Sequence, residues 1–256
     1  MKKLAILLIF FLSAFSAAIA APREYYELRT YRLTDAAQEA RVETYLNRAL
    51  IPALHRLGIK KVGVFKPLET DSTYGKKLLV LIPFHSLEEI EQLTDRLAQD
   101  KQYLLDGKDY LEATYDNPPY KRIEKIILKA FSGSPESAVP ALKSPVSERV
   151  YELRSYEGHT EKISRNKIQM FNDGDEIGLF KRLGFNAVFY GEVITGTTMP
   201  NLMYMTTFEN QASRDEHWKE FVEDPHWKKL KAMPEYQNNM SKMVIQFFRP
   251  TGYSDF

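Results

Sequence analysis

The residues that could carry chemistry in this chain recur as two matching sets, each with a glutamate, an arginine and a tyrosine at every second position. The six residues are Glu27, Arg29, Tyr31, Glu152, Arg154 and Tyr156. An arginine could bind an anionic or carbonyl group there, and a tyrosine could donate a proton or a hydrogen bond. The sequence therefore offers all six as ligand-binding residues, and the two arginines and two tyrosines also as catalytic candidates.

The same residues also admit a structural interpretation. Buried charges must be paired and hydrogen-bonded, and breaking a buried pair can cost about 3–5 kcal/mol. An ion-pair network could thus fix how two parts of the chain dock. We favour this interpretation over a catalytic one, because ion pairs also perturb pKa values where no catalysis occurs.

A spacing of two predicts β-strands, in which alternate side chains point to opposite faces. We expect Tyr26, Leu28 and Thr30 to pack beneath helices, because the helix-covered face of a sheet needs apolar contacts. The charged sets would then face an interior between two sheets, and the two Glu–Arg pairs would meet near a pseudo-twofold axis. Depending on register, the other residues lining this interior are apolar or aromatic and suit a greasy or flat ligand. They are Phe65, Val80, Ile82, Phe189, Tyr204 and Phe247.

The two sets belong to an internal repeat, which a search for self-similarity reveals. Residues 26–31 and 151–156 are identical at five of six positions, and residues 51–58 are echoed by 177–184 at almost the same spacing. A stretch rich in Ser and Pro separates the two halves. The predicted units are a first domain over residues 21–131, a linker over 132–148 and a second domain over 149–256.

Each half has the order strand, helix, strand, strand, helix, strand. Asp35 is expected to cap the first helix, Pro52 to kink it and Gly58 to end it. The predicted first-half strands are 25–33, 59–65, 78–84 and 120–131, with a second helix over 86–98. The predicted second-half strands are 149–156, 185–194, 202–208 and 243–249, with one helix ending at Gly184 and another starting at Asn210.

This βαββαβ order is the ferredoxin-like motif, in which helices cover one face of an antiparallel sheet. The other face of each copy must be buried, and the second copy in the same chain is the obvious partner. The predicted fold class is α+β, with two tandem ferredoxin-like domains packed sheet to sheet as a pseudo-dimeric α/β barrel.

Composition excludes several classes of function. The chain has 256 residues, of which 44% are hydrophobic and 27% charged, with a net charge of +1. This is a globular composition without the basic surface that nucleic acid requires. The absence of Cys rules out disulfides, thiolate nucleophiles and Cys-based metal sites. The five histidines lack metal-ligand spacing, and no nucleotide-binding or serine-hydrolase motif occurs, so we expect neither metal nor cofactor.

The N-terminus has the pattern of a cleavable signal peptide. Two lysines precede an apolar run over residues 4–15, and Ala-Ile-Ala at residues 18–20 provides a cleavage site. A membrane anchor is the alternative, but the run is shorter than the roughly 20 residues that span a bilayer. We expect residues 1–20 to be removed, leaving no membrane span. The mature chain would be periplasmic or secreted, and without Cys it cannot be a lipoprotein.

Several motifs resemble the NIPSNAP domain. They are the Tyr-Glu-Leu-Arg-x-Tyr opening, the Leu-Gly helix stop, Ala212-Ser213-Arg214-x-x-x-Trp218 and Asp224-Pro225-His226-Trp227. The resemblance is close in the second half and weaker in the first, where residues 100–103 read Asp-Lys-Gln-Tyr. It implies the dimeric α/β-barrel superfamily. It implies little about a reaction, because NIPSNAP proteins mostly lack an assigned activity, and their association with mitochondria and vesicle or mitophagy signalling would not apply to an exported protein.

Asp224 and Pro225 also have a local explanation, as N-cap and first residue of a short helix. Trp227 would then anchor that helix on the core, which we favour over a ligand-binding role. The histidines are assigned surface or capping roles, although some members of this superfamily bind haem through a histidine.

Three functions remain open. The first, which we favour, is binding of a small hydrophobic or aromatic molecule, or of a protein partner, in or beside the barrel. The second is a cofactor-free monooxygenase-like or isomerase-like enzyme that uses the arginines and tyrosines, by analogy of fold alone. The third is a structural or interaction module, which could form a homo-oligomer.

Overall fold

The computed structural model describes residues 22–256, so the expected signal peptide over residues 1–20 lies outside the described residues. Within residues 22–256, no helix is both long and apolar enough to cross a membrane. The predicted linker, residues 132–148, lies along the barrel, where the Ala138 amide donates to the Val188 carbonyl at 2.9 Å.

Eight antiparallel strands close into one barrel, in the order β1-β3-β2-β8-β5-β7-β6-β4. The first-half strands are β1 (Tyr25–Arg32), β2 (Gly63–Pro67), β3 (Lys77–Phe84) and β4 (Arg122–Ala130). The second-half strands are β5 (Val150–Glu157), β6 (Phe189–Thr195), β7 (Asn201–Phe208) and β8 (Lys242–Pro250). Each half contributes four neighbouring strands in equivalent orders, β4-β1-β3-β2 and β8-β5-β7-β6. Edge strands join the halves, β2 to β8 and β4 to β6, so both edges of each sheet are paired.

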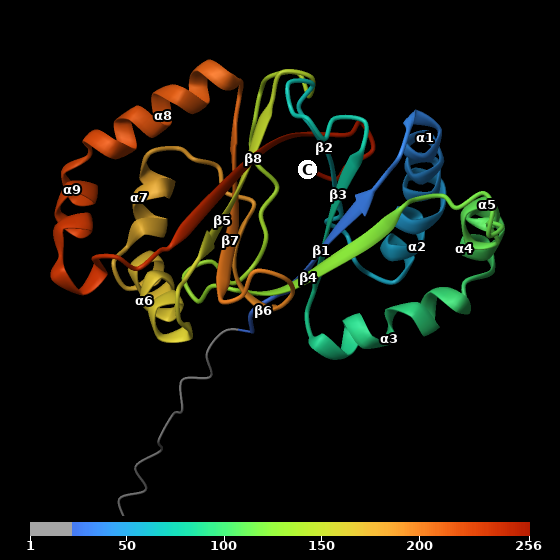
Figure 1. The fold of residues 1–256 in the computed structure, drawn as a ribbon, viewed down its shortest axis with the longest axis horizontal. Helices are drawn as coiled ribbons and strands as arrows, with labels where there is room; N and C mark the ends of the chain where they lie inside the picture. The colour runs from blue at the N-terminus through green and yellow to red at the C-terminus, as the bar shows by residue number, and fades with distance from the viewer. Residues whose placement is uncertain (1–21) are drawn as a thin grey trace, which may run out of the picture.

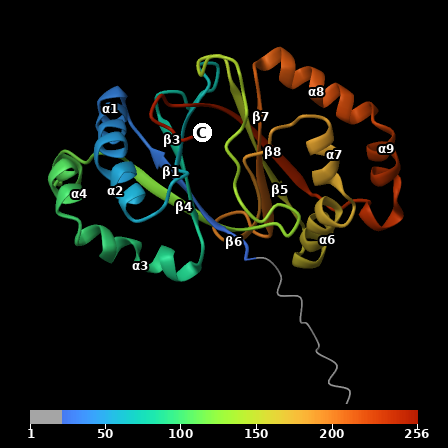
Figure 2. The same cartoon turned by 180° about the vertical axis from the view of Figure 1, so that it is seen from behind.

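Helices cover the outside of the barrel on two opposite sides (Figures 1 and 2). The first half supplies α1 (Ala36–Tyr45), the π-helix η1 (Leu46–Leu50), α2 (Ile51–Arg56), α3 (Leu87–Ala98), α4 (Lys101–Asp106) and α5 (Lys108–Leu111). The second half supplies α6 (Glu161–Asn172), α7 (Glu176–Arg182), α8 (Gln211–Glu223), α9 (Pro225–Ala232) and the 3₁₀-helix η2 (Pro234–Tyr236). The predicted pseudo-dimeric α/β barrel is confirmed.

The residues predicted to cap or end helices lie at helix ends in the structure. The side chain of Asp35 accepts a hydrogen bond from the Gln38 amide at 2.9 Å, and Asp224 caps α9 in the same way. Gly58 and Gly184 end their helices with φ of +93° and +74°, which glycine adopts without strain. One expectation was wrong: the helix before Gly184 is two helices, α6 and α7, because the chain turns at Gly174 and Asp175.

The predicted facing of the opening strands is wrong. The barrel interior is filled by apolar side chains from all eight strands, including Tyr26 and Leu28 of β1 and Leu153 of β5. The charged residues of β1 and β5 therefore point outward, beneath the helices, and the two Glu–Arg pairs do not meet at the centre. The reason is that eight strands enclose an interior with few partners for charges, whereas Lys125 of β4 and Arg214 of α8 serve as counter-ions on the outer face.

The six residues expected to line the interior divide in the same way. Phe65 and Phe189 lie inside the barrel. The other four lie on its outer face, in contact with the helical layer. They are Val80, Ile82, Tyr204 and Phe247.

Lys77 is a buried cation inside one end of the barrel, 4% exposed, with Nζ 5.0 Å from the Phe248 ring centroid and 3.1 Å from Gln246 Oε1. Burial, together with the nearby Arg32, lowers the pKa of Lys77 from 10.5 to about 8. The unfolded chain therefore holds this proton more tightly than the folded chain, and the contribution of Lys77 to stability rises with pH between about 8 and 10.5.

The Lys77→Met variant is accordingly expected to gain about 1–2 kcal/mol in free energy of unfolding at neutral pH, with part of the gain offset by the lost bond to Gln246. The gain should shrink as pH rises from about 8 to 10.5, because the wild-type amine is then neutral in the folded state and increasingly neutral in the unfolded state. Urea denaturation at neutral and alkaline pH measures both values. A variant less stable than wild type at neutral pH would contradict the prediction.

Candidate functional site

A cavity of about 500 Å³ lies on the outer face of the second half. Its walls come from β5 and β8, from helices α6, α7, α8 and α9, and from the segment between α9 and β8. A volume of this size suits a small organic ligand. Of the six residues predicted from the sequence, Arg154 and Tyr156 line it.

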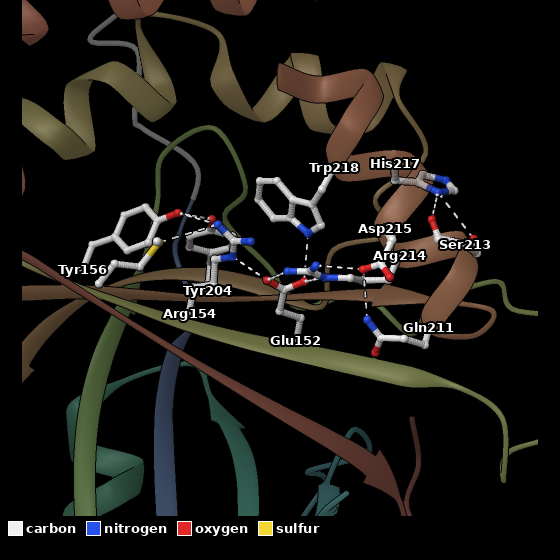
Figure 3. Close-up of polar contacts among 11 residues, drawn as sticks. Glu152, Arg154, Tyr156, Tyr204, Gln211, Ser213, Arg214, Asp215, His217 and Trp218 are labelled. Carbon is white, nitrogen blue, oxygen red and sulfur yellow. Dashed lines mark hydrogen bonds and ion pairs between the residues drawn. The ribbon is translucent and has the colours of Figure 1, made fainter. Parts of the chain in front are cut away.

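Glu152 forms the base of the site and is fully buried. Its carboxylate accepts hydrogen bonds from Arg154 Nε at 2.5 Å, from Arg214 Nε and Nη2 at 2.8 and 3.0 Å, and from Trp218 Nε1 at 2.8 Å (Figure 3). Both oxygens are thus saturated by donors from β5 and α8. The buried charge is fully compensated, as burial of a carboxylate requires.

Arg154 lies between this carboxylate and the cavity. Its guanidinium stacks 3.4 Å from the centroid of the Trp218 ring, and Nη1 donates to the Tyr156 hydroxyl at 3.2 Å and to Met243 Sδ at 3.7 Å. Burial alone would lower the pKa of Arg154, but its contacts with Tyr204, Tyr156 and Glu152 raise it overall. Arg154 is therefore a fixed positive charge.

Two tyrosines continue the hydrogen-bond chain. The hydroxyls of Tyr156 and Tyr204 lie 2.7 Å apart, with Tyr156 at the cavity and Tyr204 behind it. Burial is the largest cause that raises the pKa of Tyr204 well above its ordinary value. Tyr204 therefore stays protonated and can donate to Tyr156, which leaves the Tyr156 proton available to a group in the cavity.

A second buried ion pair also lines the cavity, with Lys167 Nζ 5.7 Å from the Tyr156 ring centroid. Lys167 Nζ is 2.9 Å from Glu176 Oε2, and both side chains are almost fully buried. The ammonium also lies 4.8 Å from the Phe171 ring centroid and 5.7 Å from that of Trp227. The cavity is thus bordered by two buried cations among aromatic rings.

The first half repeats the Glu–Arg–Tyr contacts but not the cavity. Arg29 Nε donates to Glu27 Oε1 at 2.6 Å, and Nη1 donates to the Tyr31 hydroxyl at 3.4 Å. Beside them, Tyr45 stacks on Tyr110 with ring centroids 3.6 Å apart, and the Tyr110 hydroxyl donates to Tyr31. These aromatic side chains occupy the space next to Arg29.

One position accounts for much of this difference. The helical segment α1–η1 of the first half and helix α6 of the second half bury residues at the same spacing. The equivalent positions are Val42 and Lys167, Tyr45 and Met170, and Leu46 and Phe171. Tyr45 thus corresponds to Met170, whose thinner side chain lines the cavity. The two halves share a charge motif, but the second half alone combines it with this cavity among residues 22–256.

Sequence reasoning missed several residues of the site. Arg214 and Trp218 were singled out only as a family motif, although their spacing of four puts them on one helix face. Lys167 and Glu176 gave no signal, because their pairing depends on how α6 meets α7. Trp227 packs against Phe221 as expected, with ring centroids 4.5 Å apart, but it also lines the cavity.

Three of the five histidines bind protein groups through their side chains. His55 pairs with Asp255 at 2.8 Å, His217 Nδ1 lies 2.6 Å from the Ser213 carbonyl, and His226 Nε2 lies 3.0 Å from the Gly174 carbonyl. Across residues 22–256, no cluster of three or more His, Asp or Glu side chains is placed to hold a metal ion.

Comparison with known proteins identifies one family model, which matches each half of the chain separately. The NIPSNAP family model matches this chain over residues 26–135 and again over residues 151–255. A solved structure of a NIPSNAP-like domain protein from Burkholderia xenovorans is 16% identical, with a TM-score of 0.38, and the match covers 42% of this chain and 89% of that one.

Two full-length neighbours share the whole barrel. A structure named "putative monooxygenase" from Lactobacillus acidophilus NCFM aligns with a TM-score of 0.58 at 10% identity, covering 89% of this chain and 94% of that one. A structure named as an anthrone oxidase-like protein aligns with a TM-score of 0.56 at 9% identity, covering 91% and 93%. Identities this low show the fold alone. No curated protein matches the chain.

Proposed function

This chain belongs to the NIPSNAP family, and within that family we propose that it is a binding protein that holds one small hydrophobic or aromatic molecule in the second-half cavity. The observation that carries the proposal is the cavity of about 500 Å³ itself, which is lined by five aromatic side chains and by a fixed arginine. The aromatic residues are Tyr156, Trp218, Phe221, Trp227 and Tyr236. Apolar walls with a few convergent polar groups are typical of small-molecule sites.

The electrostatics favour binding over catalysis. The pKa values of Arg154 and Arg214 are raised even though burial opposes this, and burial raises the pKa of Tyr204. All three groups therefore keep their protons at neutral pH and act as hydrogen-bond donors. A general base needs a pKa near the working pH, and these shifts move the groups away from it.

A second candidate is cofactor-free monooxygenase-like or isomerase-like chemistry. Arg154 and Tyr156 lie side by side at the cavity, where they could stabilise negative charge developing on a substrate oxygen. The monooxygenase and oxidase names of the fold neighbours belong to those proteins, and they suggest anthrone in aerated buffer as an assay. Turnover that is lost in Tyr156→Phe would favour the enzyme, and binding without turnover would favour the binding protein.

Two further parts of the proposal concern the location of the protein and its assembly with other chains. We propose export of the mature chain from Ala21, on the strength of the N-terminal sequence pattern. A protein partner, or assembly into a homo-oligomer, would instead make the chain an interaction module. That alternative predicts a defined complex in sedimentation and no small-molecule binding.

Titration with the neutral probe N-phenyl-1-naphthylamine tests the binding proposal. The chain has two tryptophans, Trp218 and Trp227, and both line the cavity. Bound probe should therefore receive excitation energy from tryptophan, and the signal should saturate at one probe per chain. In Met170→Tyr, the ring found at Tyr45 of the first half would enter the cavity, and affinity should fall about 10-fold or more, equivalent to about 1.4 kcal/mol.

The matched control is Met199→Tyr, which places the same ring at an exposed loop position outside the cavity. It should bind the probe like wild type. Absence of energy transfer in wild type, or equal binding by Met170→Tyr, would overturn the proposal.

A further inference from the structure

The inventory of donors and acceptors around the second-half cavity identifies a class of ligand. We infer that the site takes an aromatic carboxylate, with the acid group held by Arg154 and Tyr156 and the ring held among the aromatic side chains. This inference rests on the proposed binding function and adds the charge of the ligand to it.

Each carboxylate of the site is already paired with a buried cation. Glu152 accepts four hydrogen bonds, from Arg154, Arg214 and Trp218, and Glu176 Oε2 accepts from Lys167. Glu152 is fully buried beneath its partners. A cationic ligand would therefore have to share a carboxylate that already compensates a buried arginine or lysine, and it would add positive charge beside buried cations.

The donors of the site are not exhausted. Arg154 uses Nε on Glu152 and Nη1 on Tyr156 and Met243, and within residues 22–256 its Nη2 donates no hydrogen bond. Tyr156 accepts from Arg154, and Tyr204 can donate to it, so the Tyr156 proton can point into the cavity. Arginine has donors alone, so its free edge can be satisfied only by an acceptor.

The charges around the cavity also favour an anionic ligand. Four cationic side chains line it, Arg154, Lys167, Arg214 and Lys231, and Glu176 is the lining carboxylate. Lys231 is exposed and screened by solvent, so with Glu152 beneath Arg154, three positive charges face two negative ones. Asp215 binds Arg214 from outside the cavity, where its side chain is 58% exposed and therefore screened by solvent. The local potential thus favours an anion.

Shape and apolar character select the rest of the ligand. Trp227 and Tyr236 line the cavity on the side of α9 and η2, and Met240 and Met243 border it with polarisable sulfur. Thioethers and aromatic rings both contact flat aromatic faces favourably. A planar ring system bearing one carboxylate uses both the free donors and these walls.

Three naphthalene ligands of nearly equal size test the inference on the wild-type protein. They are 2-naphthoate, 2-naphthalenemethanol and 2-naphthylmethylamine, each measured by displacement of N-phenyl-1-naphthylamine. The carboxylate should bind about 10–100-fold more tightly than the alcohol, the range that one or two charge-assisted hydrogen bonds supply, and the amine should bind most weakly. Equal affinities, or a preference for the alcohol, would overturn the inference while leaving the binding function intact.

Variants locate the acid group. Arg154→Lys keeps the charge but loses the planar donor edge, and it should lower naphthoate affinity about 10-fold with little effect on the neutral probe. Lys228→Met, on an exposed position of α9 outside the cavity, removes a charge from the same region and should change neither affinity. Loss of naphthoate binding equal in both variants would show a general field effect and contradict the assignment to Arg154. Failure of all three ligands and of the probe would instead remove the proposed function itself.

Discussion

The Glu152→Ala variant is expected to lose about 3–5 kcal/mol in free energy of unfolding, which is a large fraction of the stability of a typical domain. The substitution removes the anion that two arginines and the Trp218 indole share. Arg154, only 7% exposed, would then be a buried cation without its compensating charge. Urea denaturation of wild type and variant gives the difference directly.

Two controls separate the buried charge from its surroundings. Glu152→Gln keeps an acceptor oxygen in the same shape and should lose less than Glu152→Ala. Glu124→Ala breaks an ion pair with Arg32 in which both side chains are about half exposed, and it should cost about 0–1 kcal/mol. A loss for Glu152→Ala no greater than for Glu124→Ala would show that the buried network contributes little.

The Tyr110→Ala variant is expected to lose about 3 kcal/mol and to create a second binding site. Removal of a buried aromatic ring costs about 3–5 kcal/mol, and the lower end applies because Tyr110 is partly exposed. The deleted ring stacks on Tyr45 and closes the space beside Arg29. Binding of N-phenyl-1-naphthylamine should therefore rise from one probe per chain toward two.

Tyr115→Ala is the matched control, since Tyr115 is fully exposed in the loop that follows α5. Its stability should stay within about 0.5 kcal/mol of wild type, and its stoichiometry should stay at one. A Tyr110→Ala protein that matches this control in both measurements would show that the ring does not close the first-half site.

Local sequence signals predicted most of the architecture. The repeat, the βαββαβ order and the barrel could be derived from local signals. The alternation of a strand, an N-cap such as Asp35 and a helix stop such as Gly58 each depend only on residues close by in the sequence. The helix break at Gly174 was missed, because Gly184 provided a stronger stop further along. The short helices α4 and α5 gave too few turns for a periodic pattern.

The orientation of the site could not be predicted in the same way. A period of two shows that Glu152 and Leu153 face opposite ways, but not which of them faces the barrel interior. That depends on the joining of β2 to β8 and β4 to β6, which closes the sheet around one face. Contacts between edge strands far apart in the chain leave no local pattern.

The difference between the halves was equally hidden. The motifs of β1 and β5 are nearly identical, so the sequence suggested that both sets contribute equally to one shared interior. The structure distinguishes them by the side chains that face each motif from the helices, Tyr45 in one half and Met170 in the other. Those residues lie in weakly similar parts of the repeat, where no motif marks them.

Native mass spectrometry of the chain isolated from its own source tests the central claim most directly, namely that the second half holds one small molecule. We expect one molecule of constant mass per wild-type chain, carrying an aromatic ring and an acid group, and a much smaller bound fraction in Met170→Tyr prepared in parallel. A bare wild-type chain in every preparation, or an adduct that Met170→Tyr retains in full, would contradict the claim.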